Sequence, residues 1–254
     1  MVGKLMKHEL KALFRGLLII GIVVLVFAGI GRLLIATNPN GYIGVLFAIF
    51  AIYLSLIAIF AAYIGSIAQF SRSLFTGEGY MTFSLPVTPT QLIISKLLSA
   101  LIATWFGVAV CAASCGIVLT AVPAEVMDEI AAMLGEVWQQ LSAYFASDPL
   151  LVVELVLILI SSIPMGLLLM YLIVSVGQLF TAHRKLITVA IAIGCLLIVF
   201  PILNAYCLDP ILDLATKVSI HLADWIQILL YVGIDIGSFF AVRYILKNKV
   251  NLIV

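Results

Sequence analysis

Six long apolar stretches, each about the length needed to cross a lipid bilayer, run through this chain of 254 residues. A transmembrane helix needs about 20 consecutive, mainly apolar residues. Only 10% of the residues are charged, whereas a soluble domain carries charge on roughly a quarter of its residues. We therefore expect an all-α polytopic membrane protein whose six transmembrane helices form a single transmembrane domain over residues 1–254. The predicted spans lie near residues 16–36, 42–70, 92–120, 150–179, 186–204 and 225–246.

The lysine and arginine residues are distributed unevenly among the segments that separate these spans. Cytosolic loops of membrane proteins carry an excess of positive charge. If both termini are cytosolic, only Arg32 and Lys217 of the 13 basic residues lie on the outer side. The charge pattern thus predicts an even number of spans, with the N- and C-termini in the cytosol.

The first 15 residues carry an amphipathic pattern of their own. Apolar residues recur every three or four positions, and Lys4, Lys7, Lys11 and Arg15 lie on the opposite side of the predicted helix. Such a pattern favours an interfacial helix over residues 1–15, with its basic face near the anionic head groups of the inner leaflet. The alternative is a basic flank that only fixes the topology.

Two segments expected on the outer, extracytoplasmic side, 121–149 and 205–224, are also amphipathic. In the first, apolar residues follow helical spacing, and Trp138 suits a membrane interface. In the second, a helix is predicted to begin at Asp209, with Pro210 at the first helical position. Two interpretations stay open: helices that shape a pathway through the membrane, or interfacial helices with no further role.

Two carboxylates are predicted to lie inside spans. Asp235 is near the middle of the sixth span, and Glu154 is about one turn inside the outer end of the fourth. A charged group in lipid is costly, so it normally faces protein or water. Asp235 and Glu154 are therefore candidate groups of a substrate pathway. The alternatives are a protonated acid bonded to a neighbouring helix and a contact between subunits.

The sequence contains no motif of the common enzyme classes. It has no G-x-x-x-x-G-K-[ST] phosphate loop, no H-E-x-x-H and no G-x-S-x-G. Cys111 and Cys115 share a helix face, but no further ligand completes a metal set. His8, His183 and His221 are scattered among different loops and helix ends. We therefore expect no enzymatic activity, no metal site and no cofactor bound by this chain.

The one sizeable cytosolic excursion, residues 71–91, is apolar where a water-exposed loop is normally polar. Apolar side chains on such a segment usually mark a docking site. Thr88 and Gln91 match a capping box that begins the helix of the third span, and Leu85 followed by Pro86 ends any preceding element. A force applied to this coupling segment would therefore reach the second and third spans. The alternative is a loop whose apolar residues dip into the inner interface.

The same part of the chain resembles the cytosolic loop of bacterial ABC-2 type transporter permeases. Residues 72–96 read RSLFTGEGYMTFSLPVTPTQLIISK, and the family typically shows an acidic-Gly-Tyr-Leu-Thr core, then Leu-Pro-Val, then Ser-Lys. Met81 stands where the family has leucine, and K-H-E-L-K at 7–11 is similar to the family's opening. The matching residues are Glu78, Gly79, Tyr80, Thr82, Leu85, Pro86, Val87, Ser95 and Lys96.

This resemblance implies a multi-pass permease subunit in a bacterial plasma membrane that works with a separate ATP-binding subunit, on which ATP and Mg²⁺ bind. It also implies a second permease subunit, identical or related, and export of an amphipathic substrate such as a peptide, an antibiotic or a lipid-like compound. No nucleic acid is expected as a partner. Two other classes stay open: a secondary transporter that uses Asp235 or Glu154, and a membrane scaffold. The residues expected to couple to the ATPase are Arg72, Phe75, Glu78, Gly79, Tyr80, Phe83, Leu85, Pro86 and Lys96.

Overall fold

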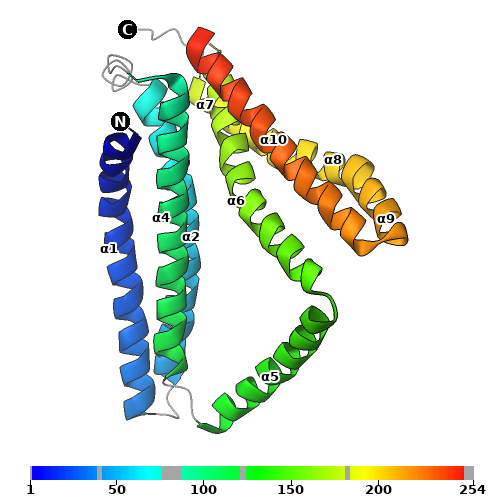
Figure 1. Cartoon of the computed structure of the whole chain (residues 1–254). Coiled ribbons are helices and arrows are strands. Elements are labelled where there is room, and N and C mark those ends of the chain that lie inside the picture. The colour runs from blue at the N-terminus through cyan, green and yellow to red at the C-terminus, as the bar shows by residue number, and fades with distance from the viewer. Residues whose placement is uncertain (1, 39–41, 76–86, 121–123, 181–183, 249–254) are drawn as a thin grey trace. The chain divides into compact units, whose positions relative to one another are not determined.

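The computed structural model describes residues 2–38, 42–75, 87–120, 124–180 and 184–248 (Figure 1). Nearly all of these residues are helical, and none of them is in a β-strand. The long helices are α1 (Val2–Thr37), α2 (Tyr42–Phe75), α4 (Pro89–Leu119), α5 (Ala124–Ser147), α6 (Pro149–Gly177) and α10 (Ile220–Asn248). Between α6 and α10 lie α7 (Arg184–Gly194), α8 (Phe200–Leu203) and α9 (Asp209–Val218), joined by the π-helical turns η1 (Cys195–Val199) and η2 (Asn204–Leu208).

Six helical segments in the described part of the chain are long and apolar enough to cross a membrane. They are α1, α2, α4, α6, the run Leu186–Val218 and α10. The predicted all-α architecture with six candidate spans is therefore confirmed. The cytosolic placement of both termini stays a prediction.

The boundary between the fifth and sixth candidate spans differs from the one expected. The fifth candidate span extends to Val218 instead of ending near 204, and α10 begins at Ile220 instead of near 225. Only Ser219, whose backbone is extended, separates the two helices. The amphipathic segment 205–224 is therefore divided between two long helices. At the other end of the chain, α1 runs without a break from Val2 into the first span, and the interfacial position of residues 1–15 stays a prediction.

Each π-helical turn lies just before a proline. The backbone N–H of Phe200 donates to the carbonyl of Cys195, and that of Asp209 donates to the carbonyl of Asn204, each five residues back. Proline lacks an N–H, and its ring clashes with the carbonyl four residues earlier in an α-helix. The wider π turn gives the ring room. The helical run therefore continues past Pro201 and Pro210.

The amphipathic segment predicted over 121–149 is helical from Ala124 to Ser147. Six large apolar side chains of α5 are exposed, in keeping with a helix that lies against something apolar such as a membrane interface. Its position on the outer side stays a prediction. The exposed apolar residues of α5 are Met133, Leu134, Val137, Trp138, Leu141 and Tyr144.

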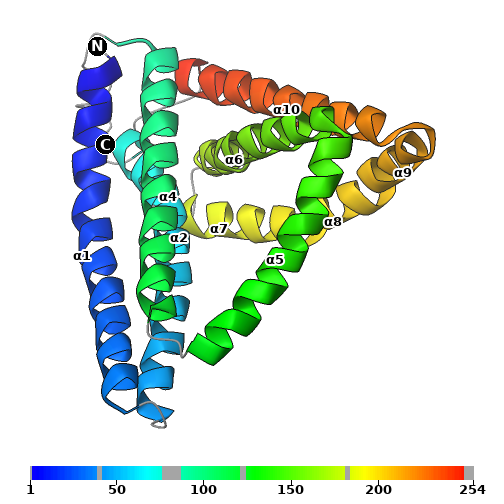
Figure 2. The ribbon, with the colours of Figure 1, turned by 60° about the horizontal axis from the view of Figure 1, so that its bottom comes forward.

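The described residues form two compact units. One unit is built mainly from residues 67–97 and 148–254, and the other from residues 3–66 and 98–147. In the second unit, α1 and the greater parts of α2 and α4 lie side by side (Figures 1 and 2). A Cβ atom on Gly31 would lie 2.9 Å from the backbone nitrogen of Ala48. Small residues thus let α1 and α2 approach backbone to backbone, as is common in membrane helix pairs.

In the first unit, α6 packs along α10 (Figure 2), and the ends of α2 and α4 join them. One buried apolar cluster contains residues from all four helices. We call it the four-helix core. Its members are Phe70 and Leu74 of α2, Leu92 and Ile93 of α4, Leu168, Tyr171 and Val174 of α6, and Val242 and Leu246 of α10.

Candidate functional site

The predicted coupling segment enters the described structure at both of its ends. Phe75 is the last residue of α2, and it packs against the four-helix core with its ring 6.1 Å from that of Phe70. Arg72 is in the last turn of α2 with an exposed side chain. Six other predicted coupling residues lie outside the described residues. They are Glu78, Gly79, Tyr80, Phe83, Leu85 and Pro86.

The capping box predicted for the start of α4 is confirmed. The backbone N–H of Thr88 donates to Oε1 of Gln91 at 3.2 Å, and the backbone N–H of Gln91 approaches Oγ1 of Thr88 at 3.4 Å. These reciprocal bonds satisfy donors that a helix otherwise leaves unpaired at its first turn. The coupling segment therefore passes directly into a well-defined helix.

Lys96 is the coupling residue that the structure places most deeply, with 3% of its surface exposed. Its ammonium group donates to the hydroxyl of Ser73 on α2. The hydroxyl of Tyr171 donates to the backbone carbonyl of Lys96 at 3.4 Å, and the Tyr171 ring stacks on Phe70 at 4.0 Å with an angle of 6°. These contacts hold α2, α4 and α6 together around Lys96.

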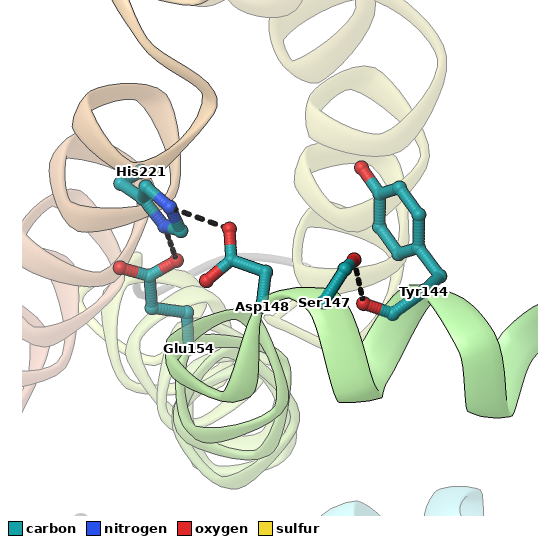
Figure 3. A network of polar contacts seen from close by, with 5 residues as sticks. All are labelled: Tyr144, Ser147, Asp148, Glu154 and His221. Atoms are coloured by element: carbon teal, nitrogen blue, oxygen red, sulfur yellow. Dashed lines mark hydrogen bonds and ion pairs between the residues drawn. The ribbon is translucent and has the colours of Figure 1, made fainter.

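A second polar site lies at the other end of α6. His221, in the first turn of α10, contacts two carboxylates of α6 (Figure 3). Its Nδ1 is 2.7 Å from Oε2 of Glu154, and its Nε2 is 2.9 Å from Oδ2 of Asp148. Glu154 is 2% exposed, whereas the side chains of His221 and Asp148 are about one-third exposed. We call Asp148, Glu154 and His221 the carboxylate–histidine trio.

Asp148 occupies the N-cap position of α6 without capping it. A carboxylate there usually accepts a backbone N–H of the first turn, but Asp148 makes no such bond and contacts His221 instead. Asp224, one turn after His221, lies within interaction range of both Glu154 and His221. Three acidic side chains thus surround one imidazole.

Asp235 is separate from the trio and half-buried in the middle part of α10. Its Oδ1 atom is buried and has no hydrogen-bond partner among the described residues. Asp224, Tyr231 and Ser238 are at helical spacing with Asp235, and Gln227 donates to the Tyr231 hydroxyl at 2.9 Å. Because Val242 and Leu246 of the four-helix core continue the same face, a polar stripe follows the buried side of α10.

The two predicted pathway residues therefore have different surroundings. Glu154 contacts His221 of the neighbouring helix α10, whereas Oδ1 of Asp235 has no hydrogen-bond partner among the described residues. His221 and Asp148 were missed as site residues. The sixth span was predicted to start at 225, which left His221 in a loop. The signal that could have found the site is that His221 precedes the sixth span, while Asp148 and Glu154 lie near the start of the fourth.

Within the described ranges, no group of three or more histidine, cysteine, aspartate or glutamate side chains is arranged to hold a metal ion. Both ring nitrogens of His221 face carboxylates, so neither is directed at an open ligand position. No protein-family model, curated protein or solved structure matches the chain.

Proposed function

We propose that this chain is the membrane-spanning permease subunit of an ATP-driven exporter of the ABC-2 type, with the ATP-binding subunit supplied by a separate protein. The observation that carries the proposal is the packing of the two helix ends that flank the coupling segment. Phe70 and Leu74 before it and Leu92 and Ile93 after it belong to one core with α6 and α10. A displacement of the segment would therefore act on four helices together, because packed cores transmit strain.

In this proposal the ATP-binding subunit lies in the cytosol of a bacterial cell and binds the apolar residues of the coupling segment. The hydrogen bonds of Lys96 with Ser73 and Tyr171 hold α2, α4 and α6 together. A displacement of the coupling segment therefore moves these helices as a group. A second permease subunit completes the pathway. Asp235 supplies an acceptor for a donor or cationic group of an amphipathic substrate, since its Oδ1 lacks a partner among the described residues.

Co-purification tests this proposal. Mild-detergent extraction of the full-length chain from its native membrane is expected to bring down a protein with a phosphate-loop motif. The double variant Tyr80→Ala/Phe83→Ala is expected to lose most of that protein. Tyr53→Ala is the matched control, because Tyr53 is 62% exposed on α2 away from the coupling segment. If wild type never retains an ATP-binding protein and the double variant transports normally, the proposal fails.

A secondary transporter is the second candidate, and it is favoured by Oδ1 of Asp235, which has no hydrogen-bond partner in the described part of the chain. A carboxylate inside a span that lacks a fixed partner can bind a coupling ion. In this case Asp235→Asn abolishes uptake driven by an ion gradient in vesicles that contain no ATP. An ATP-driven exporter shows no such uptake in wild type, so the two candidates give opposite results in one assay.

A further inference from the structure

The carboxylate–histidine trio has a hydrogen-bond geometry that requires an extra proton. A neutral imidazole carries one N–H and one lone pair, and an ionised carboxylate only accepts. Both nitrogens of His221 lie within 2.9 Å of carboxylate oxygens. A neutral ring between two ionised carboxylates would set a nitrogen lone pair against an oxygen lone pair. One added proton, on the ring or on a carboxyl, turns both contacts into hydrogen bonds.

We propose that Asp148, Glu154 and His221 form a proton-binding site that latches the start of α6 to the start of α10. The bound proton comes from water, which reaches the trio because the side chains of Asp148 and His221 are about one-third exposed. With the proton, His221 bridges two carboxylates of α6. Without it, one of the two contacts becomes repulsive, and the helix ends are no longer held. This site does not depend on the exporter proposal.

The pH range in which the latch is closed depends on the charged groups near the trio. Asp148 and Glu154 face His221 from α6, and Asp224 faces it from α10. On α9, which packs against α10, the charged side chains of Asp213 and Lys217 are exposed. The latch is closed while the trio holds the extra proton, on the ring or on a carboxyl. It opens at alkaline pH, as the trio loses that proton.

Histidine-selective ¹⁵N labelling tests the proton itself in the full-length protein in lipid nanodiscs. The chain has 3 histidines, and His221→Gln identifies the His221 signal by its loss. At neutral pH the His221 ring is expected to be doubly protonated. A singly protonated ring also supports the site if an infrared band of a protonated carboxyl disappears in Glu154→Gln or Asp148→Asn but persists in Asp235→Asn. A neutral ring with no such band overturns the site.

The latch is tested by spin labels at Leu150 and Leu222, which are exposed and flank the trio, in a chain whose four cysteines are replaced by alanine. The distance distribution is expected to be narrow at neutral pH and at least twofold broader at alkaline pH. His221→Gln is expected to be broad at both, and His221→Lys, with a charge that persists, narrow at both. Asp213→Asn is the matched control and should behave as wild type. An unchanged distribution in wild type and His221→Gln contradicts the latch.

Discussion

Lys96 brings a buried amino group into the contact between α2 and α4. Burying an ammonium group is costly unless hydrogen bonds replace its water. The Ser73 hydroxyl accepts one such bond, and only 3% of the Lys96 surface is exposed. The same residue presents its backbone carbonyl to Tyr171. Lys96 therefore contacts the Ser73 hydroxyl through its amino group and the Tyr171 hydroxyl through its backbone carbonyl.

Tyr171 shows which of its two interactions dominates. Its ring stacks on Phe70 at 4.0 Å, whereas its bond to the Lys96 carbonyl is long, at 3.4 Å. Tyr171→Phe keeps the ring and should cost about 0.5–1 kcal/mol. Tyr171→Ala removes the ring and should cost about 3–5 kcal/mol. Chemical unfolding of the purified protein in micelles measures both, and equal losses would contradict the dominance of stacking.

Gly177, the last residue of α6, has no room for a side chain. A Cβ atom there would lie 2.9 Å from the Cα of Thr188 on α7, a backbone atom that cannot swing away. Gly177→Ala is therefore expected to lower the free energy of unfolding by about 1–3 kcal/mol.

Gly237→Ala is the control for this prediction, since nothing lies within 4 Å of the added methyl. It should leave stability unchanged or raise it slightly, because alanine favours helix more than glycine does. Equal thermal unfolding midpoints for the two variants would argue against close packing of α6 on α7.

Helices and their ends could be predicted from residues close together in the sequence, but the pairing of one helix with another could not. Apolar runs predicted six spans, and the residue types at Thr88 and Gln91 predicted a capping box that the hydrogen bonds confirm. Both signals depend on residues close together in sequence. Glu154 and His221 are 67 positions apart, and hydropathy contains no information about which spans pack together.

The start of α10 shows why such a boundary was missed. Residues 220–224 contain a histidine and an aspartate, which a hydropathy window excludes from a span. They are helical nonetheless, because α10 packs against α6 and α9, and His221 in its first turn contacts Asp148 and Glu154. Tertiary contacts thus extend the helix beyond its apolar part.

The capping box gives a prediction at this scale. Thr88→Ala removes the side-chain oxygen that faces the Gln91 N–H, and a lost cap costs about 1 kcal/mol. Amides in the first turn of α4 should then exchange with deuterium about fivefold faster, while those in the middle of α4 should not change. Thr88→Ser keeps the acceptor and should exchange like wild type. Uniformly faster exchange along α4 would point to a global effect instead.

The whole molecule presents large apolar side chains to its surroundings on every candidate span. In a soluble protein this much exposed apolar surface would cause aggregation. In a bilayer the same surface is solvated by lipid tails, so the interior need only fix which helices are neighbours. Small and polar contacts, such as Gly31 on Ala48 and Ser55 on Cys111, have that role.

Thiol labelling of intact cells tests the orientation of the chain. Single cysteines replace Glu136 on α5 or Lys247 near the end of α10, both exposed, in a background without the native cysteines. A membrane-impermeant reagent should label the cysteine at position 136 at least tenfold more than that at 247, since the positive-inside rule places Lys247 in the cytosol. Permeabilised cells should label both equally. Labelling confined to position 247 would invert the topology.

The bond between Glu154 and His221 also has a consequence for biosynthesis. A ribosome completes α6 before it makes the first residue of α10. Glu154 therefore cannot contact His221 until 67 further residues have been synthesised. At roughly 5–20 residues per second, this interval lasts about 3–13 s. During that time a carboxylate lies inside a newly inserted span with its intended partner still missing. A chain truncated before Ile220 would keep this defect permanently, because it lacks His221.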